Sequence, residues 1–510
     1  MNQKKLGKLR FKNLIVLLLA MSFITLSVTS QSSVTAAAKV DISKPVQLKW
    51  YVVGNGQQTD IDLVEDEINK YLKEKLNATL KLTTYTWGDD FENRMASKIA
   101  SGTEFDITFT ANWALDYIKN SKNKAFVDIT NMMDTYAPKT KALLGKNILK
   151  GAKVNGRLYA IPSYSNNFTS YGVLLNKDMV TKYNVDTSKI KKLSDLEPIF
   201  KKIKAKEPKV IEFYPFDYYG TDTIYDSLGF EKLARNRVPG AVKRDGKSTK
   251  VINDYDSSDA KALFSLMHKW YKSGYIKNNI PSDIFSDDRE EFFDNNVSNI
   301  FAFSSSIYPM KSQEFYARNE VETVAVTLTK PAISTNNTTG TMQAISTTSK
   351  NPERALMLLE LVNTDEKLSN MINFGIEGVH YKKTGAKSIK QISPRFEDYN
   401  PGLSWLFGNQ SIAYSLPIED PKLWNEVKSI TTNAVPSPLL GFTFNSYPVA
   451  SQINKLQNIV DKYYYPLSMG KIDPAVNLPK MNKELKNAGL QKVLTEMQKQ
   501  VDAFKKSESK

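Results

Sequence analysis

The chain has 510 residues, of which 41% are hydrophobic, so it is long enough for two or more domains with large cores. It has no cysteine and two histidines, which excludes disulfides and thiol chemistry and argues against an imidazole-rich metal site or a conventional Ser-His-Asp triad. The net charge of +15 comes from mixed lysines and acids without an arginine-rich stripe, which suits an anionic cell surface better than sequence-specific nucleic-acid binding.

The N-terminus has the layout of a secretory signal peptide, which we place at residues 1–38. Five basic residues lie among the first twelve, and the apolar run Leu14–Val28 is short for a membrane span. Ala36 and Ala38 provide a small-residue cleavage motif, with Val34–Ala36 as an alternative, and an uncleaved membrane anchor is the competing interpretation. We therefore expect an extracellular protein, either secreted or held at the cell surface.

Strand and helix patterns alternate in the first part of the mature chain. They predict strands at Val46–Val53, Thr79–Thr86 and Phe105–Thr110, with helices between them. Such alternation is typical of a parallel sheet with helices on its faces, and ligands bind beyond the carboxyl ends of its strands. Three loops therefore become candidates for a binding site, namely Gly54–Thr59, Trp87–Asp90 and Ala111–Trp113.

Four residues of these loops are candidate ligand contacts: Asn55, Trp87, Asp90 and Trp113. The amide of Asn55 suits hydroxyl groups, although Gly-Asn-Gly is also simple turn chemistry. Trp87 and Trp113 follow strand ends, where a bulky ring either contacts a ligand or packs under a neighbouring loop. Asp90 stands at the start of a helix, so a capping role is the alternative. Trp50 and Trp270 fall within strand and helix patterns and are expected in the core.

The segment Asn155–Val180 predicts a chain crossing between two lobes. A turn leads into the strand Arg157–Ile161, which Pro162 ends because proline cannot donate to a sheet ladder. A polar, aromatic stretch that includes Tyr164 follows, and a second apolar strand starts at about Tyr171. Two strands and a loop within one domain is the alternative interpretation. At a hinge, Tyr164 would lie beside the cleft.

The region after this crossing is expected to form a second α/β lobe. Its strand Val297–Phe303 is followed by Tyr308, a second hinge-side candidate. Ser334–Thr341 is a polar linker without apolar periodicity, and Gly340–Thr347 is the expected second crossing. The chain is expected to finish in helices between residues 449 and 505.

Five further segments have recognisable sequences. In chain order they are GTEFDITFTANW (Gly102–Trp113), LSDLEPIFKKIK (Leu193–Lys204), NPERALMLLELV (Asn351–Val362), NFGIEGVHY (Asn373–Tyr381) and GFTFNSYPV (Gly441–Val449). Together with the crossing, they resemble the extracellular solute-binding proteins of bacterial import systems, which present sugars to ABC transporters. The resemblance is to the long branch with an extra C-terminal region. No single motif is specific, and their order along one exported chain is the stronger signal.

The resemblance implies an α/β, two-lobed fold like that of periplasmic binding proteins, with parallel-type sheets flanked by helices, hinge crossings and a cleft. It places residues 39–163 and 340–375 in the first lobe, and residues 164–339 and 376–510 in the second, which includes a helical C-terminal region. It implies a protein that is not an enzyme, holds an oligosaccharide or other small polar solute in the cleft, and delivers it to a membrane ABC permease. We expect a monomer with no cofactor and no nucleic-acid partner.

The sequence departs from this resemblance near its N-terminus. Gram-positive relatives usually carry a lipobox cysteine, and the corresponding stretch Leu26–Ser33 has none. Lipid anchoring through a cysteine is therefore impossible in this sequence. The protein would be released, held on the wall by charge, or retained by an uncleaved signal.

A saccharide would be held by aromatic rings against its C–H faces and by polar groups against its hydroxyls. Each aromatic contact adds about 0.5–1.5 kcal/mol beyond burial, and a micromolar binder needs roughly 8 kcal/mol, so two or three rings with polar partners suffice. Trp405 follows the turn at Pro401, in the part of the chain where relatives often place a stacking ring on the second lobe. Glu377, in the IEG motif, either binds a hydroxyl or braces its loop.

Two other functions remain open on the sequence. A secreted polysaccharide-degrading enzyme would need two carboxylates across one cleft, and nothing marks such a pair. A cell-wall-binding surface protein fits the basic charge but not the strand–helix alternation. The acidic run from Asp287 to Asp294 permits a calcium site, although it lacks the alternating oxygen ligands and turn glycine of an EF-hand loop, and a solvated helix start is the alternative.

Overall fold

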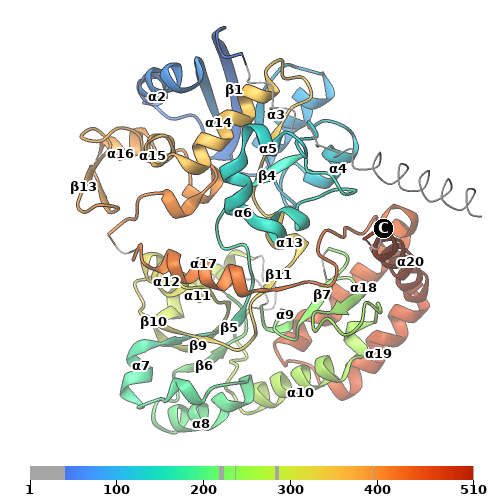
Figure 1. The fold of residues 1–510 in the computed structure, drawn as a ribbon. Helices are drawn as coiled ribbons and strands as arrows, with labels where there is room; N and C mark the ends of the chain where they lie inside the picture. Colours follow the sequence, from blue (N-terminus) through green and yellow to red (C-terminus); the bar gives the residue numbers. More distant parts are fainter. Residues whose placement is uncertain are drawn as a thin grey trace, which may run out of the picture. The chain divides into compact units, whose positions relative to one another are not determined.

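The computed structural model describes residues 41–217, 223–235, 237–281, 286–392, 394–417 and 419–508. The expected signal peptide at residues 1–38 lies outside them. From Ile42 onward the chain builds two separate β-sheets, each with its own hydrophobic core (Figure 1).

The first sheet contains the three strands expected at the start of the mature chain. Its order is β2 (Ala78–Thr86), β1 (Val46–Gly54), β3 (Ile107–Thr110), β12 (Met342–Ile345) and β4 (Ala160–Pro162). β1 pairs in parallel with β2 and β3, whereas β12 runs antiparallel to both β3 and β4. Because β1, β2 and β3 are parallel, the loops that follow them leave the sheet at the same edge.

Helices cover this sheet, and most of them follow a strand directly. They are α2 (Ile61–Leu76), α3 (Asp89–Ala100), α4 (Tyr117–Lys122), α5 (Met133–Tyr136), α6 (Pro138–Gly151), α14 (Pro352–Thr364) and α15 (Glu366–Phe374). α14 begins with Pro352 at its first position, where the missing N–H has no intrahelical partner to lose. Trp50 on β1 is fully buried, as expected, and its Nε1 donates to Oε1 of Gln343 at 2.8 Å.

The second sheet has the order β10 (Thr323–Thr327), β5 (Tyr171–Asn176), β9 (Ile300–Ser306) and β6 (Ile211–Tyr214). Only β6 and β9 are parallel; β5 runs antiparallel to both of its neighbours. Both sheets are therefore mixed. β12 and β5 are the strands that run antiparallel to both of their neighbours. Each of them is the first strand that its sheet receives after a crossing from the other lobe.

The first passage of the chain between the two sheets lies where the sequence predicted it, whereas the expected second crossing, Gly340–Thr347, contains strand β12 of the first sheet. β4 belongs to the first sheet and β5, which follows Pro162 after a short polar stretch, belongs to the second. The chain returns between β10 and β12. β11 (Ala332–Ile333) lies just before the expected linker Ser334–Thr341, and the linker contains the short helix α13 (Thr335–Thr338). Ser334 caps α13 by accepting from the backbone N–H of Asn337, which explains a helical turn in a stretch without apolar periodicity.

Helices and two small strand pairs, one antiparallel and one parallel, complete the second lobe. The helices are α7 (Lys177–Lys182), α8 (Glu197–Lys206), α9 (Thr223–Asp226), α10 (Ser258–Lys272), α11 (Asp287–Asn296), α12 (Lys311–Asn319), α17 (Leu423–Asn433), α18 (Ala450–Ser468), α19 (Pro474–Asn487) and α20 (Leu490–Glu508). The strand pairs are β7 (Phe230–Lys232) with β8 (Ala241–Lys243), and β11 with β15 (Val435–Pro436).

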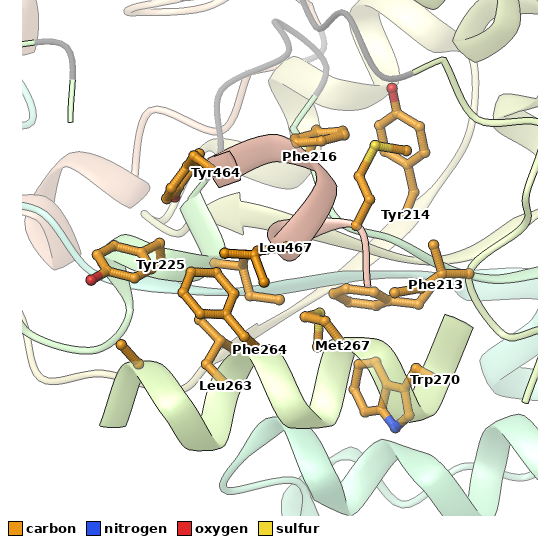
Figure 2. Close-up of a cluster of buried hydrophobic side chains, with 14 of the residues drawn as sticks. Phe213, Tyr214, Phe216, Tyr225, Leu263, Phe264, Met267, Trp270, Tyr464 and Leu467 are labelled. Atoms are coloured by element: carbon orange, nitrogen blue, oxygen red, sulfur yellow. The ribbon is translucent and has the colours of Figure 1, made fainter. Parts of the chain in front are cut away.

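The C-terminal helices belong to the core of the second lobe. α18 and α19 pack beside α10, which precedes them by about 180 residues (Figure 1). Figure 2 shows Tyr464 and Leu467 of α18 lying near Phe264 and Met267 of α10, with Phe213 of β6 in the same cluster. These five side chains are between 0% and 1% exposed, so the helices complete the core instead of forming a separate one.

Residues 376–416 make contacts that bear on the expected lobe boundaries. The segment holds β13 (Tyr381–Lys383), β14 (Ile389–Gln391) and α16 (Arg395–Asp398). Tyr399, Leu406 and Phe407 join the core around the first sheet. Oδ2 of Asp60, ahead of α2, contacts both Nη2 of Arg395 and Nε2 of His380. The lobe boundaries stay a prediction. The residues of this segment that make these contacts were expected in the second lobe, as part of residues 376–510, but they pack on the first.

Among the described residues, no helix combines the length and apolar character needed to cross a bilayer.

We expect Leu467→Ala in α18 to lower the free energy of unfolding by about 2–5 kcal/mol, because it removes a buried side chain at the contact between the C-terminal helices and α10. Guanidinium denaturation followed by circular dichroism measures this change. Val476→Ala in α19, where the side chain is 64% exposed, is the control and should change the free energy by no more than about 0.5 kcal/mol. A loss below about 1 kcal/mol for Leu467→Ala would contradict this placement of α18.

Candidate functional site

Three tryptophans from distant parts of the chain meet in one cluster. Trp87 and Trp113 lie with their ring centroids 6.3 Å apart and their planes 23° apart, a stacked arrangement. Trp405 lies 6.1 Å from Trp87 and 6.4 Å from Trp113 and is inclined to both rings. All three were candidate ligand contacts on the sequence, and the fold brings them together. We call these three residues the tryptophan cluster.

The position of the cluster follows from the first sheet. Trp87 comes directly after β2 and Trp113 three residues after β3, at the edge where the parallel strands end. Trp405 lies in the 3₁₀ turn Ser404–Leu406, whose neighbour Pro401 contacts the end of β1. The approach is close: a Cβ on Gly54 would lie 2.1 Å from the carbonyl oxygen of Pro401, so only glycine fits there.

The indole N–H groups of Trp87 and Trp113 are already used inside the protein. Nε1 of Trp113 donates to the carbonyl oxygen of Gly340 at 2.6 Å, and Nε1 of Trp87 donates to Oδ1 of Asn55 at 3.3 Å. Asn55 is itself held, because its Nδ2 donates to the carbonyl oxygen of Asn400 at 2.9 Å. The rings are thus fixed at their polar ends, while 42% of Trp87 and 50% of Trp113 stay exposed.

Buried phenylalanine side chains pack against the tryptophan cluster on its protein side. Phe109 of β3 lies 5.6 Å from Trp113 and 6.0 Å from Phe91 of α3, and both phenylalanines are at most 1% exposed. Such close packing leaves the tryptophan rings little freedom to move. The cluster is therefore a preformed, partly exposed aromatic surface on a rigid base.

Asp90 stabilises the Trp87 loop. Its Oδ2 accepts from the backbone N–H and the hydroxyl of Thr86, both at 3.1 Å, and its Oδ1 accepts from Nε of Arg94 at 2.5 Å. The hydrogen bond from Arg94 is the main reason that the pKa of Asp90 lies below its ordinary value. The carboxylate is therefore ionised at neutral pH and joins the end of β2 to the first turn of α3. Asp90 therefore has a structural role other than the expected capping, since α3 has no side-chain cap hydrogen bond, and its role in ligand contact stays a prediction.

Tyr164, Tyr308 and Glu377 lie in other surroundings. Tyr164 is 5% exposed and belongs to the core of the first lobe. Tyr308 packs on a small cluster near the crossings and its hydroxyl donates to Glu314. Glu377 is exposed, with its Oε2 3.5 Å from Nζ of Lys383. The described contacts join none of the three to the tryptophan cluster, and their roles in binding stay predictions.

Polar groups that the sequence did not indicate lie beside Trp113. Nδ2 of Asn112 donates to the backbone carbonyl and the side-chain oxygen of Asn336, at 3.0 and 2.9 Å. The carbonyl oxygen of Asn112 accepts from Nη2 of Arg235, which lies in the second lobe between β7 and β8. Asn112 was inside a candidate loop, but nothing in the sequence pairs it with a residue 123 positions away.

In the part of the chain that the structure describes, no three His, Cys, Asp or Glu side chains lie close enough together to hold a metal ion. The acidic run considered for calcium begins α11. Its first turn is capped by Ser286, whose hydroxyl accepts from the backbone N–H of Arg289, the geometry expected of a solvated helix start.

Two kinds of comparison identify related proteins. The profile of a family described as bacterial extracellular solute-binding protein matches residues 55–367, and a domain of unknown function matches residues 438–506. A carbohydrate ABC transporter substrate-binding protein of Streptococcus pneumoniae serotype 4 is 30% identical over 469 residues, which cover 91% of this chain and 92% of the relative.

Solved structures agree with these matches. The N-glycan transport solute binding protein of Streptococcus pneumoniae is 29% identical, with a TM-score of 0.77 over 91% of this chain and all of that one. The same protein in complex with Man5GlcNAc gives a TM-score of 0.61 at 28% identity, over 91% of this chain and 99% of that one. The two-lobed α/β fold predicted from the sequence is therefore confirmed.

The stacked pair should give an exciton signal in the circular dichroism of the indole B band. We expect Trp87→Phe and Trp113→Phe each to weaken this signal, with effects that do not add up in the double variant, because the three rings of the tryptophan cluster couple pairwise at 6.1–6.4 Å. Trp424→Phe is the control, since that ring packs in a different cluster with α17. Two unlike difference spectra that add up in the double variant would contradict the stacking.

Proposed function

Since the chain belongs to the family of bacterial extracellular solute-binding proteins, we propose that it captures an oligosaccharide between its lobes. It then delivers the sugar, chemically unchanged, to a membrane ABC permease. The single observation that carries the sugar assignment is the tryptophan cluster. Its two most exposed rings lie at the carboxyl-end edge of the first sheet with their polar atoms already bonded to the protein.

The cluster suits the C–H face of a pyranose ring. An indole whose N–H is already used offers a ligand mainly its flat apolar face, and each such contact is worth about 0.5–1.5 kcal/mol beyond area burial. Rings in three orientations accommodate more than one sugar unit. Hydroxyl groups then require polar partners nearby, and Asn112, Asn336 and Arg235 stand beside Trp113.

The nature of the relatives narrows the choice of sugar. The Streptococcus pneumoniae protein that transports N-glycans has structures in complex with Man1GlcNAc and with Man5GlcNAc. At 28–29% identity over nearly the full length, that protein provides the first solutes to test. We propose a glycan of mannose and N-acetylglucosamine as the solute of this chain.

Closure of the lobes on the solute is part of the proposal. The N-glycan transport protein matches this chain with a TM-score of 0.77 in one structure and with 0.65 and 0.61 in its complexes with Man1GlcNAc and Man5GlcNAc. Sequence identity hardly differs among these comparisons, so the lower scores reflect a different conformation of that protein. Two sheets joined by crossings provide the hinge for such a movement here.

We further propose that the protein is exported by its N-terminal segment and works outside the membrane as a monomer. It has no lipobox cysteine, so its basic charge or an uncleaved signal would keep it near the permease. A hydrolytic role has no support of its own, because two carboxylates near the tryptophan cluster are already bonded to the protein. Asp90, three residues after Trp87, is engaged by Thr86 and Arg94, and Glu92 accepts from the backbone N–H of Leu115.

Incubation with Man5GlcNAc separates the proposed function from its alternatives. We expect saturable binding by calorimetry, a smaller radius of gyration in small-angle scattering at saturation, and no new reducing ends. New reducing ends would identify a hydrolase, and binding to isolated cell walls but to no soluble glycan would identify a wall-binding protein. A scattering profile that does not change at saturation would count against closure of the lobes.

Trp113→Ala should weaken glycan binding at least tenfold, about 1.4 kcal/mol, because it removes the most exposed ring of the tryptophan cluster. The melting temperature should stay within about 2 °C of the wild type, since half of the side chain is already exposed. Tyr447→Ala, which removes an 86% exposed ring in the second lobe, is the matched control and should bind like the wild type. Normal affinity combined with a large loss of stability would assign Trp113 to packing alone.

A further inference from the structure

The loop between β7 and β8 in the second lobe carries Arg235, which contacts the first lobe next to the tryptophan cluster. Arg235, in this loop, donates from Nη2 to the carbonyl oxygen of Asn112, the residue before Trp113. A guanidinium has five N–H donors, so its bond to a backbone carbonyl leaves other donors with which it can bind a sugar hydroxyl. The position of this loop therefore affects the surroundings of Trp113.

The base of the loop is fixed by a buried ion pair. Nζ of Lys232 lies 2.5 Å from Oδ2 of Asp254, whose side chain is fully buried. The other oxygen of Asp254 accepts from the backbone N–H of Gly240 at 3.1 Å, and the hydroxyl of Tyr225 donates to Oδ2 at 2.8 Å. Burial lowers the pKa of Lys232, while the neighbouring Asp254 opposes this shift. One carboxylate thus ties together both ends of the loop.

The loop itself contains a strained residue that the C-terminal helices hold. Arg237 has φ = 62°, a left-handed conformation that a side chain other than glycine rarely adopts. Its carbonyl oxygen accepts from the hydroxyl of Tyr255 at 2.7 Å. Its Nη1 donates to the hydroxyl of Tyr464 in α18 at 2.8 Å, and the guanidinium lies 4.5 Å from the centre of that ring. Strain of this kind persists only where the surrounding structure over-determines it.

α20 holds the same loop from another direction. A Cβ on Gly240 would lie 2.2 Å from Sδ of Met497, so the loop backbone rests directly on this helix. Beyond β8, Oε1 of Gln498 accepts from the backbone N–H of Val251 at 2.7 Å. Tyr464 of α18 and Met497 of α20 therefore contact the loop, and Gln498 of α20 bonds to the segment after β8; all three lie within the domain of unknown function at residues 438–506.

We propose that this C-terminal helical region is a brace for residues 233–235 and 237–240, which lie between β7 and β8, and that it fixes the position of Arg235 relative to Asn112 and Trp113. It thereby sets the affinity for solute without touching the solute itself. The effect on affinity rests on the proposed function, whereas the bracing of the loop does not. In these terms Tyr464, Met497 and Gln498 are positioning residues.

The bracing is tested without any ligand by hydrogen exchange of the full-length protein. Tyr464→Phe removes the hydroxyl that accepts from Arg237 and keeps the ring that packs with Tyr225 and Phe264. The amide of Leu233 donates across the loop to the carbonyl oxygen of Gly240, and the amide of Gly240 donates to Oδ1 of Asp254. We expect hydrogen exchange of both amides to become at least tenfold faster.

Tyr463→Phe is the matched control. It removes the hydroxyl of the preceding residue, which donates to Oε1 of Glu484 at 2.7 Å, and should alter the same two amides less than twofold. Equal exchange in wild type and Tyr464→Phe, or an equal change in both variants, would overturn the brace.

The consequence for affinity is tested with Man5GlcNAc by titration calorimetry in a double-mutant cycle. Tyr464→Phe should weaken binding at least threefold in the wild-type background and have no further effect in an Arg235→Ala background, because the brace acts through Arg235. Tyr463→Phe should bind like the wild type in both. A threefold loss that recurs with Arg235→Ala would show that Tyr464 acts on binding by another route, and would overturn the link to Arg235.

The two proposals fail in distinguishable ways. If the wild type binds neither Man5GlcNAc nor Man1GlcNAc, the proposed solute is wrong, and the exchange rates of Leu233 and Gly240 still decide whether the brace exists. If the wild type binds Man5GlcNAc and Tyr464→Phe binds equally well despite faster exchange, the proposed function stands and the influence of the C-terminal helices on affinity is refuted.

Discussion

The candidate site depends on one geometric constraint, the parallel pairing of β1, β2 and β3. Parallel strands end at the same edge of a sheet, so the loops after them converge although long helices separate them in sequence. This convergence puts Asn55, Trp87 and Trp113 within reach of one another. The glycine at the end of β1 then lets Pro401 approach to within contact distance, which brings Trp405 to the same place.

The second lobe contributes to the site in a different way. Its sheet stands apart from the tryptophans, and its described link to them is Arg235, at the tip of a small hairpin instead of at a strand end. A hairpin tip is mobile unless it is supported, and here a buried ion pair and two distant helices support it. The C-terminal helices thus have two roles in the second lobe: they complete its hydrophobic core, and they support the loop that carries Arg235.

Much of the fold was predictable because its signals are local. Apolar runs that end in turn residues marked β1, β2, β3 and β5, and Pro162 marked the first crossing. The same signals placed Trp87 and Trp113 correctly at strand ends. What they did not reveal was the mixed character of both sheets, because the direction in which a crossing strand enters its sheet leaves no mark on its own alternation of side chains. The short helix α13 was missed for a related reason: a capping hydrogen bond forms it without any apolar stripe.

The sequence by itself determined the class of protein: a long, cysteine-free, two-lobed α/β chain with tryptophans in the loops after its strands. Only the tertiary structure decided that Trp87, Trp113 and Trp405 share one surface, that Tyr164 is buried, and that Asn112 meets Arg235. The physical reason is the range of the interactions concerned. Turn chemistry and periodicity act over a few residues and are written in the local sequence. A ring contact such as that between Trp87 and Trp405, or a hydrogen bond between lobes, exists only once both sheets have formed and the chain has crossed between them.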